Sequence, residues 1–441
     1  MRWIALCVVT ACAAEPGGAP TAPSLPEPVV LDPGPTVTSS DLATWDATFG
    51  DDQTSLWRGL CETLSWVTPA LAHDASCSPV ITKAPTAAYH DEWDVHDWAI
   101  AVATMYELSL DPKYLDELGQ LDDVLVAARG AYDPTRGRTY AGWVIDRGCK
   151  WGSFDVTGLF AGMLARYARI VTEHADQLGP AYTARAERYA TAASLALADI
   201  PADERSEDAT HLLYLVTPGA KPACTAQITS PGLPYPYNMH HLMMGAMVDL
   251  VVARARGLDT QGLGPLVAEA QQDLPRLWTQ WRDDAVRATP GASGSDVEFE
   301  RWPSGLSPDG KARIEDSSHA AVTIELLTRV ERQLPWIEPL VPCGLDATTS
   351  LDDGLANTLV DVATAQDGGT WEFPGDMDGT ANETVYSRAQ RSCAGWALVA
   401  PHSAQAYARC EAVTLAEIAG DQPNLTAGDV AALLWMKPMA P

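Results

Sequence analysis

Residues 238–256 read NMHHLMMGAMVDLVVARAR, and this stretch decides the fold class. Its apolar side chains recur at positions i, i+3, i+4 and i+7, which is the spacing of one face of an α-helix. Residues 265–281, PLVAEAQQDLPRLWTQW, repeat that spacing after a short break. The two stretches therefore predict two helices packed as a hairpin.

The same pattern occurs in pairs along most of the chain. We expect further helical pairs at 94–108 with 113–128, 154–172 with 181–198, 316–333 with 351–365, and 391–398 with 404–418, and an earlier pair within 40–69. Such hairpins, recurring at roughly 60 to 85 residues, are typical of helical repeat architectures. The sequence thus predicts one all-α domain over residues 40–441, with about five to six hairpins.

Long connections rich in Gly, Pro and Trp separate the hairpins, at 133–153, 201–237, 289–315 and 366–388. If the hairpins form a ring, their first helices run parallel and the N-termini of these helices meet on one rim. Long ordered loops in a compact domain are often functional. We therefore expect a binding site where these four connections converge.

The charge of the chain limits its partners. The formal net charge is -29, which disfavours binding to nucleic acid or to the surface of an anionic bilayer. It also weighs mildly against a strongly anionic substrate. We expect a monomer without a cofactor that meets a polysaccharide or oligosaccharide.

The N-terminus has the order of a secretory signal. Arg2 precedes a short apolar run at residues 3–9, far below the roughly 20 residues needed to span a bilayer. Val9-Thr10-Ala11-Cys12 resembles the lipobox of bacterial lipoproteins, which implies cleavage after residue 11 and a lipid on Cys12. Residues 12–39 then form a flexible Pro/Gly/Ala-rich linker. The alternative is a plain signal peptide with an incidental cysteine.

This N-terminus predicts an exported protein, lipid-anchored at the outer membrane or cell surface of a Gram-negative-type bacterium. In an exported chain, cysteines are more often disulfide partners than metal ligands. The local pairs that we favour are Cys61 with Cys77 and Cys393 with Cys410. Seven cysteines follow Cys12, so at least one thiol stays outside these bonds.

Several short patches resemble the (α/α) toroid proteins that act on polysaccharides, especially uronate-directed lyases. They are Glu315-Asp316-Ser317-Ser318-His319-Ala320 with Trp302 upstream, Tyr235-Pro236-Tyr237-Asn238 with His240 and His241, Trp151 with Asp155-Val156-Thr157-Gly158, and Gly395-Trp396. The resemblance implies an (α/α) toroid or incomplete barrel. This chain departs from the lyase pattern where Met239 separates Asn238 from His240, and where Ser304 stands in place of a tyrosine.

A uronate lyase must neutralise the sugar carboxylate, remove the adjacent proton and protonate the leaving oxygen. By this resemblance, Asn238 with Arg301 or Arg313 would bind the carboxylate. His319 or His241 would act as base, and Tyr237 or Tyr386 as acid. The remaining candidates for substrate binding are Arg388, Trp151, Trp302, Trp371, His240, Glu315 and Asp316.

Structural roles compete with these assignments. Asp316 and Ser317 suit the N-cap of a helix, where they satisfy backbone N–H groups without catalytic duty. His240 and His241 point about 100° apart on a helix, so one of them is expected to be structural. His319 is as well suited to a hydrogen-bonded inner face as to catalysis. We expect no metal site.

Three classes of function remain open. The first is a lyase of uronic-acid-containing glycans. The second is a glycoside hydrolase on the same toroid, which needs two opposed carboxylates; its candidates are Asp97, Asp155, Glu315 and Asp316. The third is a surface lipoprotein that binds glycan or protein without catalysis.

Overall fold

The computed structural model describes residues 92–146, 150–222, 229–303, 306–307, 313–334, 350–361, 365–367, 370–372, 376–377 and 395–419. The predicted signal peptide, Cys12, the predicted linker and the helical pair expected within 40–69 therefore lie outside the described residues, as do Cys61, Cys77 and Cys393. Cys410 is described and fully buried, and its pairing with Cys393 stays a prediction.

Helices dominate the described residues, which are 62% helical. In chain order they are α5 (Glu92–Ser109), α6 (Pro112–Ala128), α7 (Phe154–Glu173), α8 (Pro180–Ala198), η1 (Ala202–Glu204), α10 (Tyr237–Ala255), α11 (Leu263–Ala285), α12 (Ser317–Gln333), α13 (Leu351–Asp361), η3 (Trp396–His402) and α14 (Ala404–Ala419). The mostly helical class predicted from the apolar spacing is confirmed. No helix in these stretches is long and apolar enough to cross a membrane.

Short antiparallel strand pairs, which the sequence analysis did not foresee, occupy the connections. They are β1 (Tyr132–Asp133) with β2 (Arg138–Thr139), β3 (Val144–Asp146) with β4 (Lys150–Gly152), β5 (Arg205–Glu207) with β6 (Leu212–Tyr214), β7 (Val286–Pro290) with β8 (Ser295–Phe299), and β9 (Ala365–Asp367) with β10 (Thr370–Glu372). Strands this short give no periodicity that a sequence pattern can detect. The strict all-α prediction is therefore correct only in its coarser form.

The helices α5, α7, α10 and α12 pack side by side and run parallel. Arg166 of α7 bonds to Thr104 of α5, and Arg169 of α7 bonds to Asp249 of α10. His241 and Asp249 of α10 reach Thr323 and Arg329 of α12 in the same order. In each neighbouring pair, residues later in one helix contact residues later in the other. The helices are therefore parallel, and their N-termini lie at one end of the row.

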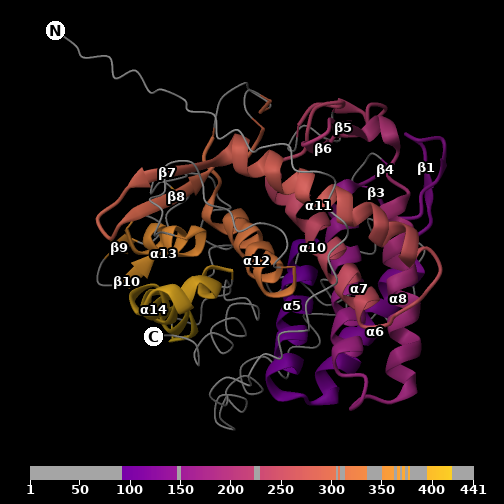
Figure 1. The fold of residues 1–441 in the computed structure, drawn as a ribbon, viewed down its shortest axis with the longest axis horizontal. Coiled ribbons are helices and arrows are strands. Elements are labelled where there is room, and N and C mark those ends of the chain that lie inside the picture. Colours follow the sequence, from indigo (N-terminus) through magenta and orange to yellow (C-terminus); the bar gives the residue numbers. More distant parts are fainter. Residues whose placement is uncertain are drawn as a thin grey trace, which may run out of the picture.

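Helices α7 and α10 approach each other closely at Gly158, where a larger side chain would crowd α10. A Cβ atom added at Gly158 would lie 3.0 Å from the Cβ of Leu242 and 3.2 Å from the backbone nitrogen of Met243. Helices α6, α8 and α11 pack on the outer side as partners of α5, α7 and α10 (Figure 1). Trp396 joins η3 to the end of the row by donating from its indole nitrogen to the carbonyl of Ser317 at 2.8 Å.

Three of the four long connections, 133–153, 201–237 and 289–315, gather at the N-terminal end of the row, while most of 366–388 lies outside the described residues. Figure 1 shows β3–β4, β5–β6 and β7–β8 at the same end of the helices. Neighbouring connections contact one another: Arg136 pairs with Glu204 at 2.6 Å, and the backbone N–H of Tyr237 donates to the carbonyl of Arg301 at 2.9 Å. The arrangement of the helical hairpins as a toroid stays a prediction.

Buried ion pairs tie the four parallel helices together. Glu107 of α5 accepts from Arg166 and Arg169, while Asp249 of α10 accepts from Arg169 at 2.9 Å and from Arg329 at 3.1 Å. Burial would raise the pKa of Glu107, but the charges of Arg169 and Arg166 lower it to about 2. Arg166 also reaches Glu325 of α12 at 3.2 Å, which joins α7 to α12 directly.

We predict that Asp249→Asn lowers the free energy of unfolding by about 3 kcal/mol, because it leaves two buried guanidinium groups without their shared counter-charge. The measurement is urea denaturation followed by circular dichroism. Asp259→Asn is the matched control, because it breaks an exposed pair with Arg254 and should change stability by less than about 0.5 kcal/mol. Equal effects of the two substitutions would contradict a structural role for the buried network.

Candidate functional site

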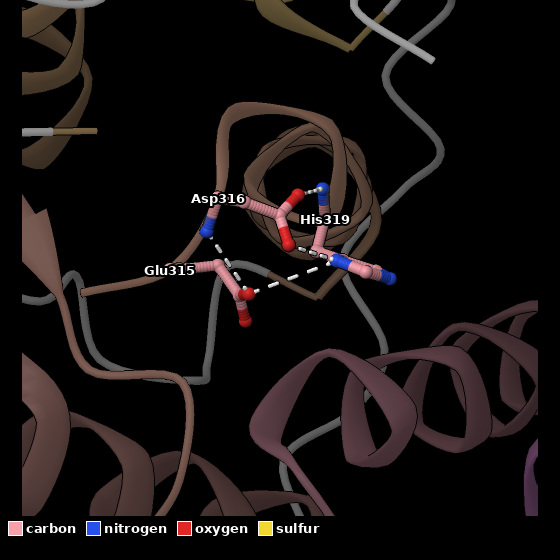
Figure 2. A group of neighbouring side chains, drawn as sticks. All are labelled: Glu315, Asp316 and His319. Carbon is pink, nitrogen blue, oxygen red and sulfur yellow. Dashed lines mark hydrogen bonds and ion pairs between the residues drawn. The ribbon is translucent and has the colours of Figure 1, made fainter. Parts of the chain in front are cut away.

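The N-terminus of α12 carries a cluster of polar side chains (Figure 2). Asp316 is the N-cap, and its Oδ1 accepts from the backbone N–H of His319 at 3.0 Å. Its other oxygen, Oδ2, lies 2.5 Å from Nδ1 of the His319 ring. The capping role considered for Asp316 is thus confirmed, and the same carboxylate also orients His319.

Arg301 approaches this cluster from the segment that follows β8. Its Nη1 donates to Oδ2 of Asp316 at 3.0 Å, and its Nε lies 3.7 Å from Oε1 of Glu315. The guanidinium carbon stands 4.7 Å from the centre of the Trp302 ring, within the range of a cation–π contact. Arg301 and His319 therefore meet at one carboxylate oxygen.

Glu315 lies beneath the cluster and is fully buried. Its Oε1 accepts from the backbone N–H of Asp316 at 3.2 Å, whereas its Oε2 has no hydrogen-bond partner. Burial raises the pKa of Glu315 to about 7, and the charge of Arg301 offsets only part of that effect. Glu315 therefore changes its charge near neutral pH.

The start of α10 supplies the second group of predicted residues, and His240 among them is structural. Its Nε2 accepts from the backbone N–H of Tyr214 at 2.8 Å, and its Nδ1 donates to the carbonyl of Pro236 at 3.0 Å. Both ring nitrogens are therefore used within the fold, and burial lowers the pKa of His240 to about 4. A substrate-binding role for His240 does not fit this arrangement.

Asn238 and His241 lie one turn apart on α10 and are almost completely buried. Nδ1 of His241 lies 2.7 Å from the hydroxyl of Thr323 on α12, and its ring meets Trp281 edge-on at 5.1 Å. Nε2 of His241 and both amide atoms of Asn238 have no partner. Burial, followed by the neighbouring His240, lowers the pKa of His241 well below its usual value. Neither side chain reaches the surface that Arg301 and His319 share.

Tyr237, the predicted acid, has a structural role. Its hydroxyl donates to Asp284 of α11 at 2.7 Å, and burial together with that carboxylate raises the pKa of Tyr237 far above its usual range. Such a phenol is a poor proton donor to a leaving group. The other candidate acid, Tyr386, lies outside the described residues, as does Arg388.

The tryptophan candidates differ in their surroundings. Trp151 is a core residue, only 3% exposed, so it offers no platform for a sugar ring. Trp302 is 7% exposed and faces the guanidinium of Arg301. The backbone of Trp371 pairs with Gln366 in the β9–β10 hairpin. Arg313 is exposed, and its carbonyl accepts from the N–H of Arg301 at 2.9 Å.

Glu315, Asp316 and His319 also have the composition of a metal site. One ligand atom from each lies within 4.8 Å of the others, and no other such group occurs among the described residues. However, Asp316 already balances the charge of Arg301 and bonds His319 with the same oxygen. The contacts therefore favour an ion-paired cluster over a cation site.

The partners that decide several of these roles lie far away in the sequence. Asp284 holds Tyr237, and Thr323 holds His241, across separations of 47 and 82 residues. No local pattern marks such pairs. By contrast, the i, i+3 spacing of Asp316 and His319 was visible in the sequence, because residues so spaced are neighbours on a helix end.

We predict that Glu315→Gln makes the protein more stable at pH 8 and changes its stability little at pH 4. The folded pKa of about 7 lies above the usual value of 4.5 in the unfolded chain, so the folded state holds a proton that the unfolded state loses between these values. Stability due to this group is complete below pH 4.5 and declines as the pH rises to 7, by up to about 3 kcal/mol.

The measurement is the midpoint of thermal unfolding from pH 4 to pH 8 for wild type and variant. Glu187→Gln, at an exposed position of α8, is the control and should leave the pH profile of the wild type unchanged. A Glu315→Gln profile parallel to that of the wild type would contradict the raised pKa, because it would show that Glu315 binds its proton equally in the folded and unfolded states.

Comparison with known proteins yields no family for this chain. No family model matches it, and no curated protein matches it. Support for a function therefore comes from the contacts around Arg301, Asp316 and His319.

Proposed function

We propose that this protein cleaves a uronic-acid-containing polysaccharide by β-elimination at the N-terminal end of α12, with His319 as the base. The observation that carries the proposal is the bond between Nδ1 of His319 and Oδ2 of Asp316 at 2.5 Å. A base must be held in one orientation and one tautomer, and a carboxylate bonded to one ring nitrogen provides both.

The Asp316 carboxylate, as the hydrogen-bond acceptor, determines the tautomer of the His319 ring. A carboxylate accepts hydrogen bonds, so the proton of a neutral His319 ring resides on Nδ1 and the lone pair on Nε2. In Figure 2 the ring extends away from Glu315 and Asp316, with its second nitrogen on the far side. About a quarter of the side chain is exposed, which leaves it accessible to a polymer.

In this reaction Nε2 of His319 takes the proton from the carbon next to the sugar carboxylate. The electrons of that C–H bond form a carbon–carbon double bond, and the glycosidic bond at the β carbon breaks. The leaving oxygen then takes a proton from an acid. Tyr237 is held by Asp284, so this role falls to Tyr386 in the proposal.

The sugar carboxylate needs a cationic or amide partner, because neutralising it acidifies the adjacent carbon. Arg313 is exposed beside Arg301 and suits that role. Asn238 is fully buried, so it could reach a sugar only if the packing around the start of α10 opened. We therefore assign recognition of the carboxylate to Arg313 first.

Hydrolysis of a glycoside has weaker support. It needs carboxyl groups facing each other across the sugar, about 5 to 9.5 Å apart. Glu315 and Asp316 instead belong to one cluster, where both lie against Arg301 and His319. Asp155 is 6% exposed and accepts from Ser153. These contacts do not provide an opposed pair.

The proposal places this reaction at the cell surface, on a protein anchored through Cys12. The order of Arg2, the short apolar run and Val9-Thr10-Ala11-Cys12 supports export and lipidation. A linker from 12 to 39 would let the domain reach extended polymers near the membrane.

We predict that the purified protein produces an unsaturated uronate, seen as a rise in ultraviolet absorbance, on at least one polyuronate. His319→Gln should lower the rate at least about 100-fold, because a positioned base contributes that much or more. His211→Gln is the matched control: His211 also lies three residues after an aspartate that it contacts, Asp208, but away from α12.

A panel of pectate, alginate, hyaluronan, chondroitin and heparosan covers the common uronates. If none of these glycans gives a rise in absorbance but reducing ends are released, the reaction is hydrolysis and not elimination. If neither product forms but the protein still binds these glycans in a pull-down, the result would favour a surface protein that binds glycan without catalysis. Equal losses in His319→Gln and His211→Gln would remove His319 as the base.

Replacing Cys12 by serine should release the protein from the membrane fraction of the expressing cell, because the lipid is the proposed anchor. Fractionation and mass spectrometry of the N-terminal peptide measure this. A wild-type protein that is soluble, or whose mature N-terminus lacks a lipid, would favour the plain signal peptide.

A further inference from the structure

We infer that Arg301 is a positioning residue that acts on His319 through Asp316, and not a ligand of the substrate. Its guanidinium bonds Oδ2 of Asp316 at 3.0 Å, and that same oxygen lies 2.5 Å from Nδ1 of His319. The inference concerns the site of the proposed function, but its main readout needs no substrate.

The backbone of Arg301 is held on both sides. Its N–H donates to the carbonyl of Arg313, and its carbonyl accepts from the N–H of Tyr237, each at 2.9 Å. The side chain therefore starts from a point fixed between the segment before α12 and the first turn of α10. The guanidinium carbon lies over the ring of Trp302, 4.7 Å from its centre, which restricts the movement of the group.

The charge of Arg301 is already matched within the protein. Nη1 faces Asp316, and Nε lies 3.7 Å from the buried Glu315. A sugar carboxylate that bound this guanidinium would compete with carboxylates that the fold holds in place. A guanidinium that binds one carboxylate oxygen while lying over an indole ring suits a fixed support, a role that lysine fills poorly.

The physical effect on His319 follows from sharing one acceptor. Arg301 holds Oδ2 of Asp316 at the position where it accepts from Nδ1, which keeps the basic lone pair on Nε2. Without Arg301, the Asp316 carboxylate can turn about its N-cap contact, because Oδ1 still accepts from the backbone N–H of His319. The ring then loses its preference between the two tautomers.

The test is the ¹⁵N spectrum of the histidine side chains in the full chain, at a pH where the rings are neutral. The His319 signal is assigned by its absence in His319→Gln. The wild type should show predominantly the Nδ1–H tautomer, and Arg301→Gln should increase the share of the Nε2–H tautomer severalfold. Arg301→Lys should recover only part of the wild-type ratio.

Arg287→Gln is the matched control, because Arg287 pairs with Glu300 on the same hairpin outside the cluster. It should leave the His319 signal unchanged. If Arg301→Gln does not fold, Asp316→Asn provides the second arm, since asparagine still caps a helix but gives up the shared anionic acceptor. It should produce the same tautomer shift, and adding Arg301→Lys to it should change nothing further.

An unchanged tautomer ratio in folded Arg301→Gln, or in Asp316→Asn, would overturn the inference. Where a uronate is cleaved, Arg301→Gln should lower kcat and leave KM within about twofold. A raised KM with unchanged kcat would instead identify Arg301 as a ligand of the carboxylate. If no glycan is cleaved, the proposed function fails, and the tautomer ratio still decides the role of Arg301.

Discussion

The buried ion pairs between the parallel helices are the constraint on which the rest of the structure depends. Asp249 sits between Arg169 and Arg329, so α7 and α12 are both tied to α10 through one carboxylate. Unpaired charges in this interior would be very costly, so the helices can adopt few other registers. The network sets the axial position of α12, and hence the level of its N-terminus.

The candidate site is a consequence of that alignment. Because the helices run parallel, the connections before α10 and α12 meet at one end, where the carbonyl of Arg301 accepts from the N–H of Tyr237. The side chain of Arg301 then reaches Asp316, which orients His319. The ion pairs in the middle of the helices thus align the helix ends at which the polar cluster forms. Glu315 adds a carboxyl that changes charge near neutral pH beneath the exposed groups.

Some of this could be predicted locally and some could not. Helical spacing placed α7, α10 and α12 within a few residues, because the period of apolar side chains depends only on the helix itself. The exposure of Asn238, His240 and His241 could not be predicted in the same way. Adjacent polar residues at a helix start look alike in sequence whether they face solvent or a neighbouring helix.

The mostly helical class and the packing of α5 with α6, α7 with α8 and α10 with α11 follow from the sequence, since they depend on apolar side chains a few positions apart. The predicted pair of α12 and α13 is wrong, because α13 packs mainly against β8 and η3 instead. Tertiary structure decided which of the candidates share a surface. It committed Tyr237 to Asp284 and His240 to Tyr214, and it brought Arg301 to Asp316. The physical reason is that a buried polar atom must find its partner wherever the packed helices place one, and no local pattern encodes that position.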